Sequence, residues 1–167
     1  GGEPCSEDLE VLKKVRDSLM AAKPHWVSMD YGATEKMANG DWAASVNWNG
    51  SSMRIRLDKD TVAYGYPREG YPLWMDSVML LKDAQNVDNA YVFLNYMLRP
   101  EVVAAATNFI GYANANKAAN AFVDPAVLAD PAIYPDAETQ SRLWAPKALN
   151  EEQERALTRI FQDIKSG

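Results

Sequence analysis

The feature that most constrains this fold is an apolar run over residues 71–81 that contains one acidic residue, Asp76. Its length and composition are typical of a buried strand, and turn-forming residues bound it on both sides. Alternation along a strand places Asp76 on the same face as Trp74. Because a buried carboxylate needs a partner, we expect one of two arrangements. Either an acid lies in an apolar wall beside an indole, where a ligand neutralises it, or a strand-end Asp caps a turn or pairs with Lys82.

An aromatic ring beside a carboxylate suits an organic cation, which gains cation–π attraction from the ring and ion pairing from the acid. Two more aromatic residues, Trp48 and Tyr112, lie where predicted elements end. Trp48 is followed by a Gly-containing polar turn, and such turns after strands bind ligands in open α/β sheets. Each aromatic residue is also a candidate for the hydrophobic core. The residues alone leave these two interpretations open.

The composition favours a binding protein over an enzyme. The chain has 167 residues, with 17 basic and 23 acidic ones, and its net charge of −6 disfavours nucleic acid and favours cationic ligands. No apolar window approaches the roughly 18 residues that a membrane span needs. One cysteine, Cys5, and one histidine, His25, offer neither a metal-ligand set nor a Ser-His-Asp triad. No second acid is placed to pair with Asp76, and there is no phosphate-binding glycine loop. We expect no cofactor and no catalysis.

Local patterns predict both helices and strands. Apolar residues three and four positions apart indicate helices, whereas strict alternation indicates strands. The predicted helices cover residues 6–22, 33–38, 87–98, 100 to about 106 and 150–165, with short turns at 124–125, 130–131 and 135–136; the predicted strands cover 25–28, 42–48, 62–66 and 71–81, and 53–57 fits either.

Capping residues fix the ends of several predicted helices. Ser6 is the expected N-cap of the first helix, the Asn39-Gly40 pair is expected to stop the second, and Asn150 is the expected N-cap of the last. The apolar face that the last helix is predicted to bury consists of Ala156, Leu157, Ile160, Phe161 and Ile164.

Several motifs together resemble the C-terminal half of periplasmic spermidine/putrescine-binding proteins, the solute receptors of polyamine ABC importers. The resemblance covers nearly the whole chain. It implies an α/β fold of the periplasmic-binding-protein-like (type II) two-lobe class, present as an N-terminally truncated fragment. The motifs are Trp48-Asn49-Gly50-Ser51, Trp74-Met75-Asp76-Ser77, Phe93–Val102, Ile110-Gly111-Tyr112 and Tyr134–Thr139.

The resemblance also implies a division of the chain between lobes. Residues 1–74 would form part of the C-terminal lobe. Residues 75–112 would comprise a crossing strand and helices that belong to the otherwise missing N-terminal lobe. Residues 113–167 would return to the C-terminal lobe and end in its C-terminal helices. Because residues 78–110 would then lack their partner sheet, we expect exposed apolar faces there and self-association of the isolated fragment.

Five ligand-binding residues follow from the resemblance. Trp48 corresponds to a cleft aromatic residue that packs on the polyamine's methylene chain. Trp74 and Asp76 match the aromatic residue and the amine-binding carboxylate of the crossing segment, and Tyr112 matches a cleft tyrosine. Ser51 stands where putrescine-specific members carry an acid and spermidine-preferring members carry serine.

Two further positions bear on ligand preference. The run from Tyr112 to Lys117 resembles the putrescine branch of the family. Near the C-terminus, Ala145 stands where spermidine-type members place a ligand-contacting glutamine. The choice between spermidine and putrescine therefore stays open.

The function that we expect is capture of a linear polyamine in the periplasm and its delivery to an inner-membrane ABC permease. The partners would be the polyamine, the permease and the missing N-terminal lobe, with no nucleic acid. The alternatives are a receptor for another small organic cation, a ligand-free signalling partner, and a hydrolase or lyase that uses Asp76 as general base. Because micromolar binding already demands about −8 kcal/mol, we expect the fragment alone to bind polyamine weakly or not at all.

Overall fold

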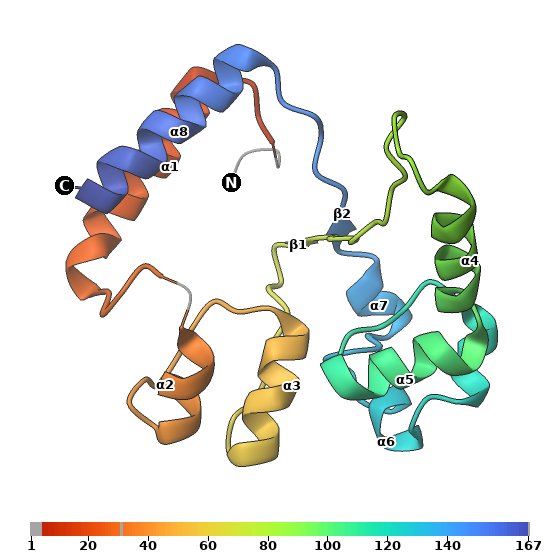
Figure 1. Cartoon of the computed structure of the whole chain (residues 1–167). Helices are drawn as coiled ribbons and strands as arrows, with labels where there is room; N and C mark the ends of the chain where they lie inside the picture. The colour runs from red at the N-terminus through yellow and green to blue at the C-terminus, as the bar shows by residue number, and fades with distance from the viewer. Residues whose placement is uncertain (1–4, 31, 167) are drawn as a thin grey trace. The chain divides into compact units, whose positions relative to one another are not determined.

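The computed structural model describes residues 5–30 and 32–166, which fall into two compact units. One unit combines the segments Gly1–Tyr31 and Trp144–Gly167, and the other is the continuous segment Gly32–Leu143. Helices dominate both units, as Figure 1 shows, and each of the two described strands is only two residues long. The candidate ligand residues all lie in the second unit.

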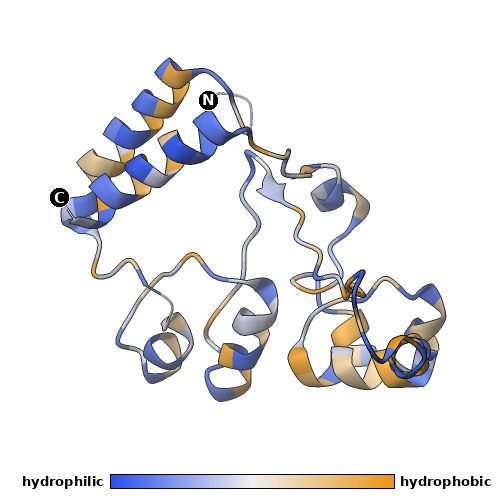
Figure 2. Cartoon of the chain, turned by 45° about the horizontal axis from the view of Figure 1, so that its top comes forward, coloured by the Kyte–Doolittle hydropathy of each residue, from blue (hydrophilic) through white to orange (hydrophobic). Residues whose placement is uncertain are grey.

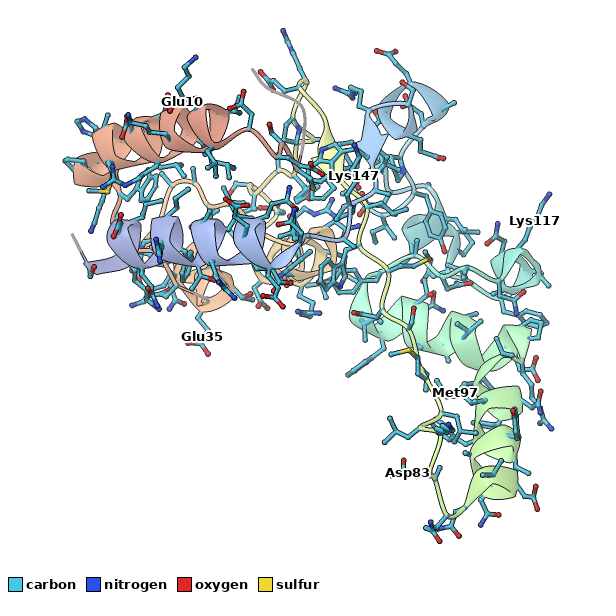
Figure 3. All side chains as sticks on the ribbon, turned by 90° about the horizontal axis from the view of Figure 1, so that it is seen from above. Glu10, Glu35, Asp83, Met97, Lys117 and Lys147 are labelled. Atoms are coloured by element: carbon cyan, nitrogen blue, oxygen red, sulfur yellow. The ribbon has the colours of Figure 1, made fainter. Side chains whose placement is uncertain are left out.

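The first unit pairs two long helices, α1 (Leu9–Ala22) and α8 (Glu151–Ser166), which run side by side (Figure 1). Leu12 and Ile164 are the buried apolar residues of the pair. Arg16 Nε donates a hydrogen bond to Asp163 Oδ2 at 3.0 Å across the two helices. Both of these side chains are partly exposed, so the ion pair contributes about 1 kcal/mol at most. The labelled Glu10 points away from α8 in Figure 3.

The ends of these helices follow local capping chemistry. The predicted N-cap of α8 is confirmed: the backbone N–H of Gln153 donates to Asn150 Oδ1 at 2.9 Å, and the N–H of Asn150 donates to Gln153 Oε1 at 2.8 Å. This reciprocal pair is a capping box. The predicted cap of α1 is wrong, because Asp8 rather than Ser6 accepts from the first turn. After α1, the 3-10 helix η1 (Lys23–His25) replaces the start of the strand predicted over 25–28.

The apolar face predicted for α8 is only partly buried. Ile164 is buried, and Ala156 and Ile160 are half-buried. Leu157 and Phe161 are exposed. A pair of helices covers one narrow stripe of each partner, which is why the predicted face is wider than the buried one.

The second unit is built mainly from short helices. Gly40, with φ of 82°, and Gly111, with φ of 74°, take the left-handed conformation that ends a helix, as predicted for Gly40. Asp124 and Asp136 cap the two shortest helices with their carboxylates. Its helices are α2 (Ala33–Asn39), α3 (Asn49–Asp58), α4 (Val87–Met97), α5 (Pro100–Ile110), η2 (Lys117–Ala121), α6 (Pro125–Leu128) and α7 (Ala137–Gln140).

A small core forms where α5 meets η2. Ala104, Ala119 and Val123 are buried together, and Tyr134 packs at their edge. The buried Thr107 Oγ1 accepts a hydrogen bond from Asn114 Nδ2 at 2.9 Å. This core fixes the C-terminal half of α5, the part that leads into Gly111 and Tyr112.

Most of the predicted strands are wrong. Residues 42–48 and 62–66 have no strand pairing, and only β1 (Tyr71–Pro72) forms within 71–81, paired with β2 (Leu143–Trp144). The N–H of Tyr71 donates to the carbonyl of Arg142 at 3.3 Å, whereas Pro72 has no N–H to extend the ladder. An apolar alternating run becomes a strand only when neighbouring strands accept its hydrogen bonds.

The segment after β1 and the helix that follows it expose apolar side chains. Figure 2 colours much of α4 and α5 as hydrophobic. No helix among the described residues is both long enough and apolar enough to cross a membrane. The exposed apolar residues of this region include Val78, Met79, Leu81, Tyr91, Val92 and Phe93.

Candidate ligand-binding site

Two indoles face each other in the second unit. Trp48 precedes the first turn of α3, where its backbone N–H donates to Asn47 Oδ1 at 2.9 Å. Trp74 follows β1, and its ring centroid lies 5.9 Å from that of Trp48 with an interplanar angle of 55°. Trp48 is 42% exposed and Trp74 is 64% exposed. The pair therefore exposes aromatic surface and does not fill a core, which was one of the two interpretations that the sequence left open.

Asp76 is fixed by the second of these indoles. Trp74 Nε1 donates a hydrogen bond to Asp76 Oδ1 at 3.0 Å. This partner is the indole rather than Lys82, the residue that the alternative interpretation named. The carboxylate is exposed, so the prediction of an acid buried in an apolar strand is wrong. Since the segment has no sheet to enclose it in the described chain, the acid keeps its hydration and can accept further hydrogen bonds.

The third aromatic residue, Tyr112, packs against α3. A Cβ added to Gly50 would lie 2.5 Å from Cδ2 and Cζ of the Tyr112 ring, closer than carbon atoms approach. Gly111 is also close to Met53, whose Cε would lie 2.7 Å from a Cβ added to Gly111. The region 53–57, which fitted either helix or strand, is thus helical and supports the turn that carries Tyr112.

Ser51 lies in the first turn of α3 and is 8% exposed. Arg54, one helical turn later, donates from Nη2 to Ser51 Oγ at 3.2 Å and from Nη1 to the carbonyl of Ile110 at 3.1 Å. Arg54 is not recognisable as a site residue from the sequence alone. Its i, i+3 spacing from Ser51 becomes a signal only when residues 49–58 are recognised as a helix.

Tyrosine contacts and an ion pair support the region around α3. Burial raises the pKa of Tyr66 to about 12, with a further contribution from Tyr64. The Tyr66 hydroxyl donates to the carbonyl of Ala132 at 2.7 Å. Arg56 and Asp130 form an ion pair at 2.5 Å, with side chains that are 27% and 15% exposed. These contacts hold α3 against the chain that follows α6.

Stacked tyrosine rings connect Tyr66 to β1. The Tyr66 and Tyr71 ring centroids lie 4.3 Å apart, and the Tyr71 hydroxyl donates to the carbonyl of Thr139 at 2.9 Å. Burial raises the pKa of Tyr64, and the neighbouring Tyr112 hydroxyl raises it further.

The structure thus brings the predicted residues together as two sets. One set contains Trp48, Trp74 and Asp76, and the other contains Ser51 and Tyr112. Both sets lie at the start of α3: Trp48 is the N-cap residue before it, and Ser51 and Gly50 lie in its first turn. Among residues 5–30 and 32–166, no three potential metal ligands from His, Cys, Asp and Glu gather in one place. The arrangement can hold an ammonium group at a carboxylate and pack an alkyl chain against indoles.

Comparison with known proteins agrees with this chemistry. The chain is 31% identical over 169 residues to the putrescine/agmatine-binding protein of Pseudomonas aeruginosa, an alignment that covers 97% of this chain and 46% of that protein. It is 39% identical over 137 residues to the putrescine-binding periplasmic protein PotF of Escherichia coli, covering 78% of this chain and 37% of that protein. The resemblance that the motifs predicted is confirmed by these relatives.

A solved structure shows the same fold. The spermidine/putrescine ABC transporter substrate-binding protein PotD of Streptococcus pneumoniae matches with a TM-score of 0.82 and 25% identity, over 96% of this chain and 50% of that chain. The fold is therefore that of part of a type II periplasmic-binding-protein-like α/β protein, as predicted. The chain spans about half the length of the relatives it matches.

The family model for bacterial extracellular solute-binding proteins matches residues 6–135. That range includes Trp48, Ser51, Trp74, Asp76 and Tyr112. The chain belongs to the family of bacterial extracellular solute-binding proteins.

Proposed function

We propose that this chain supplies one half of a binding site for a linear polyamine, in a periplasmic receptor that delivers its ligand to an ABC permease. The observation that carries the proposal is the Asp76 carboxylate, held at 3.0 Å by Trp74 Nε1 beside the Trp48 ring. The named relatives bind putrescine, agmatine or spermidine. The proposed role is binding and not catalysis.

The proposed contacts divide the ligand by its chemistry. An ammonium group would donate to the free lone pairs of Asp76, a charge-assisted bond that is stronger than a neutral one. Cation–π attraction to Trp48 and Trp74 would add about 0.5–2 kcal/mol for each ring. The methylene chain would pack on the same rings, and Tyr112 would complete the wall.

The missing affinity would come from the rest of the receptor. Micromolar binding needs about −8 kcal/mol, more than one carboxylate and a few aromatic contacts supply after the entropy of association is paid. We propose that residues 75–112 belong to a second lobe and that residues 1–74 and 113–167 belong to the lobe represented here. Ligand would then stabilise closure of the lobes, a hinge movement that a permease can recognise.

The test is Asp76→Asn in the full-length receptor, with tryptophan fluorescence and calorimetric titration of putrescine and spermidine. Losing a hydrogen bond to a charged group of about 1.5–3 kcal/mol weakens binding roughly 10- to 150-fold. The control is Asp83→Asn, which removes an equal charge from the turn before α4 (labelled in Figure 3) and leaves affinity unchanged. Unchanged binding in Asp76→Asn, or chemical turnover of the amine detected by mass spectrometry, would contradict the proposal.

A further inference from the structure

The start of α3 carries an unusual residue. Trp48 is the N-cap residue, a position that Ser, Thr, Asp or Asn normally occupies because their side-chain oxygens accept hydrogen bonds from the first turn. An indole has a donor and no acceptor, and within the described residues Trp48 makes no side-chain cap. Other contacts must therefore hold the first turn of α3 and the tryptophan that precedes it.

The residue after Trp48 makes such a contact. Asn49 is the first residue of α3, and its Nδ2 donates a hydrogen bond to the carbonyl of Ala132 at 3.0 Å, across 83 positions of the chain. Ala132 is 5% exposed and the following Ile133 is 2% exposed. The acceptor therefore lies in a packed part of the second unit, and the Asn49 amide ties the start of α3 to it.

A second contact joins α3 to the same segment. The N–H of Ala132 donates to Asp130 Oδ1 at 2.9 Å, and Asp130 forms an ion pair with Arg56. Arg56 follows Asn49 by about two helical turns. Two separated points of α3 are thus attached to residues 130–132, and this fixes the direction in which the helix begins.

The position of Trp48 depends on the first of these two points. Its backbone N–H is bonded to Asn47 Oδ1, but a bond between neighbouring residues moves with them and does not attach them to the rest of the unit. The Trp48 ring is exposed and its centroid lies 5.9 Å from that of Trp74. The covalent link to Asn49 therefore transmits the Ala132 contact to the indole.

We infer that Asn49 is a positioning residue of the proposed polyamine site: its bond to the Ala132 carbonyl holds Trp48 at the angle to Trp74 that a bound ligand requires. This inference rests on the proposed function and adds a residue that does not itself touch the ligand. Without the bond, only a fraction of the molecules would present Trp48 correctly, and the apparent affinity would fall by that fraction.

The Ala132 carbonyl keeps a second donor when Asn49 is replaced. The Tyr66 hydroxyl donates to the same oxygen at 2.7 Å, so no buried acceptor is left without a partner. Alanine also has a higher helix propensity than asparagine. Asn49→Ala should therefore fold, and its main effect should be on the position of Trp48.

The experiment is calorimetric titration of putrescine and spermidine with Asn49→Ala in the full-length receptor. We expect both amines to bind roughly 2- to 12-fold more weakly, the fold-change that corresponds to the net contribution of one hydrogen bond, about 0.5–1.5 kcal/mol. Both amines should be affected, because both would pack on Trp48.

A second measurement needs no ligand. Two indoles in contact give an exciton couplet in the circular dichroism spectrum, and its size depends on the angle between their rings. Trp74→Phe identifies the part of the spectrum that comes from the Trp48–Trp74 pair. That couplet should decrease in Asn49→Ala, and also in Asn49→Leu, which has a side chain of similar size without the donor.

Asn108→Ala is the control for a general loss of stability. Asn108 also joins its side-chain amide to a distant backbone group, since its Oδ1 accepts from the N–H of Asp124 at 2.9 Å and so links α5 to the start of α6. This variant should lower the thermal unfolding temperature but leave the couplet and both affinities unchanged.

The outcomes separate this inference from the proposed function. An unchanged couplet or unchanged affinity in Asn49→Ala, or a normal couplet in Asn49→Leu, overturns the inference and leaves the proposed function standing. Equal losses of couplet and affinity in Asn108→Ala also overturn it, because the effect would then be one of general stability. Failure of the unmodified receptor to bind either amine overturns the proposed function, and with it the role of Asn49 in binding.

Discussion

The two sides of the candidate site differ in how they are held. On the α3 side, Gly50 touches the Tyr112 ring, and Arg56 is paired with Asp130. On the other side, residues 73–79 have no regular secondary structure and are exposed. There Asp76 is held by the single described hydrogen bond from Trp74 Nε1.

This difference indicates that the two sides contribute differently to stability and to ligand binding. A packed side chain loses its rotamer freedom when the protein folds, so the α3 side is preorganised before ligand arrives. The Trp74–Asp76 side must still be ordered, and ligand binding would supply that free energy. Changes on the α3 side should therefore affect stability, whereas changes on the Trp74–Asp76 side should affect mainly ligand affinity.

The largest expected effect on stability comes from Gly50→Ala. The new methyl group would overlap the Tyr112 ring, so either the ring or the first turn of α3 must move. Overpacking of this kind costs about 1–3 kcal/mol, which urea unfolding monitored by circular dichroism would measure. Ligand affinity should fall as well, because the displaced ring belongs to the proposed site.

The matched control is Gly65→Ala, since no atom lies within 4 Å of a Cβ added there. That variant should be as stable as the unmodified chain or slightly more so, because alanine restricts the unfolded state. Tyr112→Ala should relieve most of the Gly50→Ala penalty when the two are combined. Equal stability of the two glycine variants would mean that the α3 side is no better held than the other side.

Asp130→Ala should have an effect of similar size. It leaves the half-buried Arg56 guanidinium without its partner and removes the acceptor of the Ala132 N–H, a bond of 2.9 Å. We expect a loss of about 2–3 kcal/mol, below the range for fully buried pairs because both side chains keep some solvent contact. Glu151→Ala, which breaks an exposed pair within α8, should cost less than about 0.5 kcal/mol. A similar loss in both variants would contradict the assignment of Arg56 and Asp130 as a supporting pair.

The features that could be predicted from sequence are those with local causes. The Asn150 cap and the stop at Gly40 depend on residues within one helical turn, and both predictions are confirmed. The motifs around Trp48, Trp74 and Tyr112 led to the correct family because they combine several short segments. The positions of helix starts were less certain, as Ser6 and Asp8 show.

The features that could not be predicted depend on distant partners. The run 71–81 has the composition of a buried strand, but burial requires a sheet on both sides, and sequence periodicity carries no information about whether that sheet is present. Asp76 is exposed for this reason. Arg54 was missed for a related reason, because its contact to the Ile110 carbonyl joins residues 56 positions apart in the chain.

Trp74→Ala tests the less supported side and should change stability little. The Trp74 ring is mostly exposed, and its contact with Trp48 is an aromatic pair worth about 0.5–1.5 kcal/mol. We expect a loss of about 1 kcal/mol or less, together with faster amide hydrogen exchange around Asp76. A loss as large as that of Gly50→Ala would remove the distinction between the two sides.

The smallest expected effect on stability comes from protonation of Asp136, which lies near β1, between the α3 side and the Trp74–Asp76 side. Asp136 caps α7, and the N–H of Thr139 donates to its Oδ1 at 2.7 Å. This backbone hydrogen bond, helped by the Thr139 hydroxyl and by Arg142, holds the pKa of Asp136 below its ordinary value. The carbonyl of Thr139 in turn accepts a hydrogen bond from the hydroxyl of Tyr71, which lies in β1 directly before the exposed segment 73–79. Protonation of Asp136 should therefore loosen the anchor of that segment.

The sign follows from the lowered pKa. An acid with a depressed folded-state pKa stabilises the protein above its unfolded-state value and loses that contribution as pH falls through the folded-state value. Asp136→Asn keeps an oxygen for the Thr139 N–H but cannot titrate, so its stability should fall less below about pH 4. Exchange of the Tyr71 amide should accelerate in acid more in the unmodified chain than in Asp136→Asn, while residues 73–79 exchange rapidly in both. The Tyr71 amide should not exchange as rapidly as those of residues 73–79 at neutral pH. If it does, β1 belongs to the poorly ordered Trp74–Asp76 side and not to the packed α3 side.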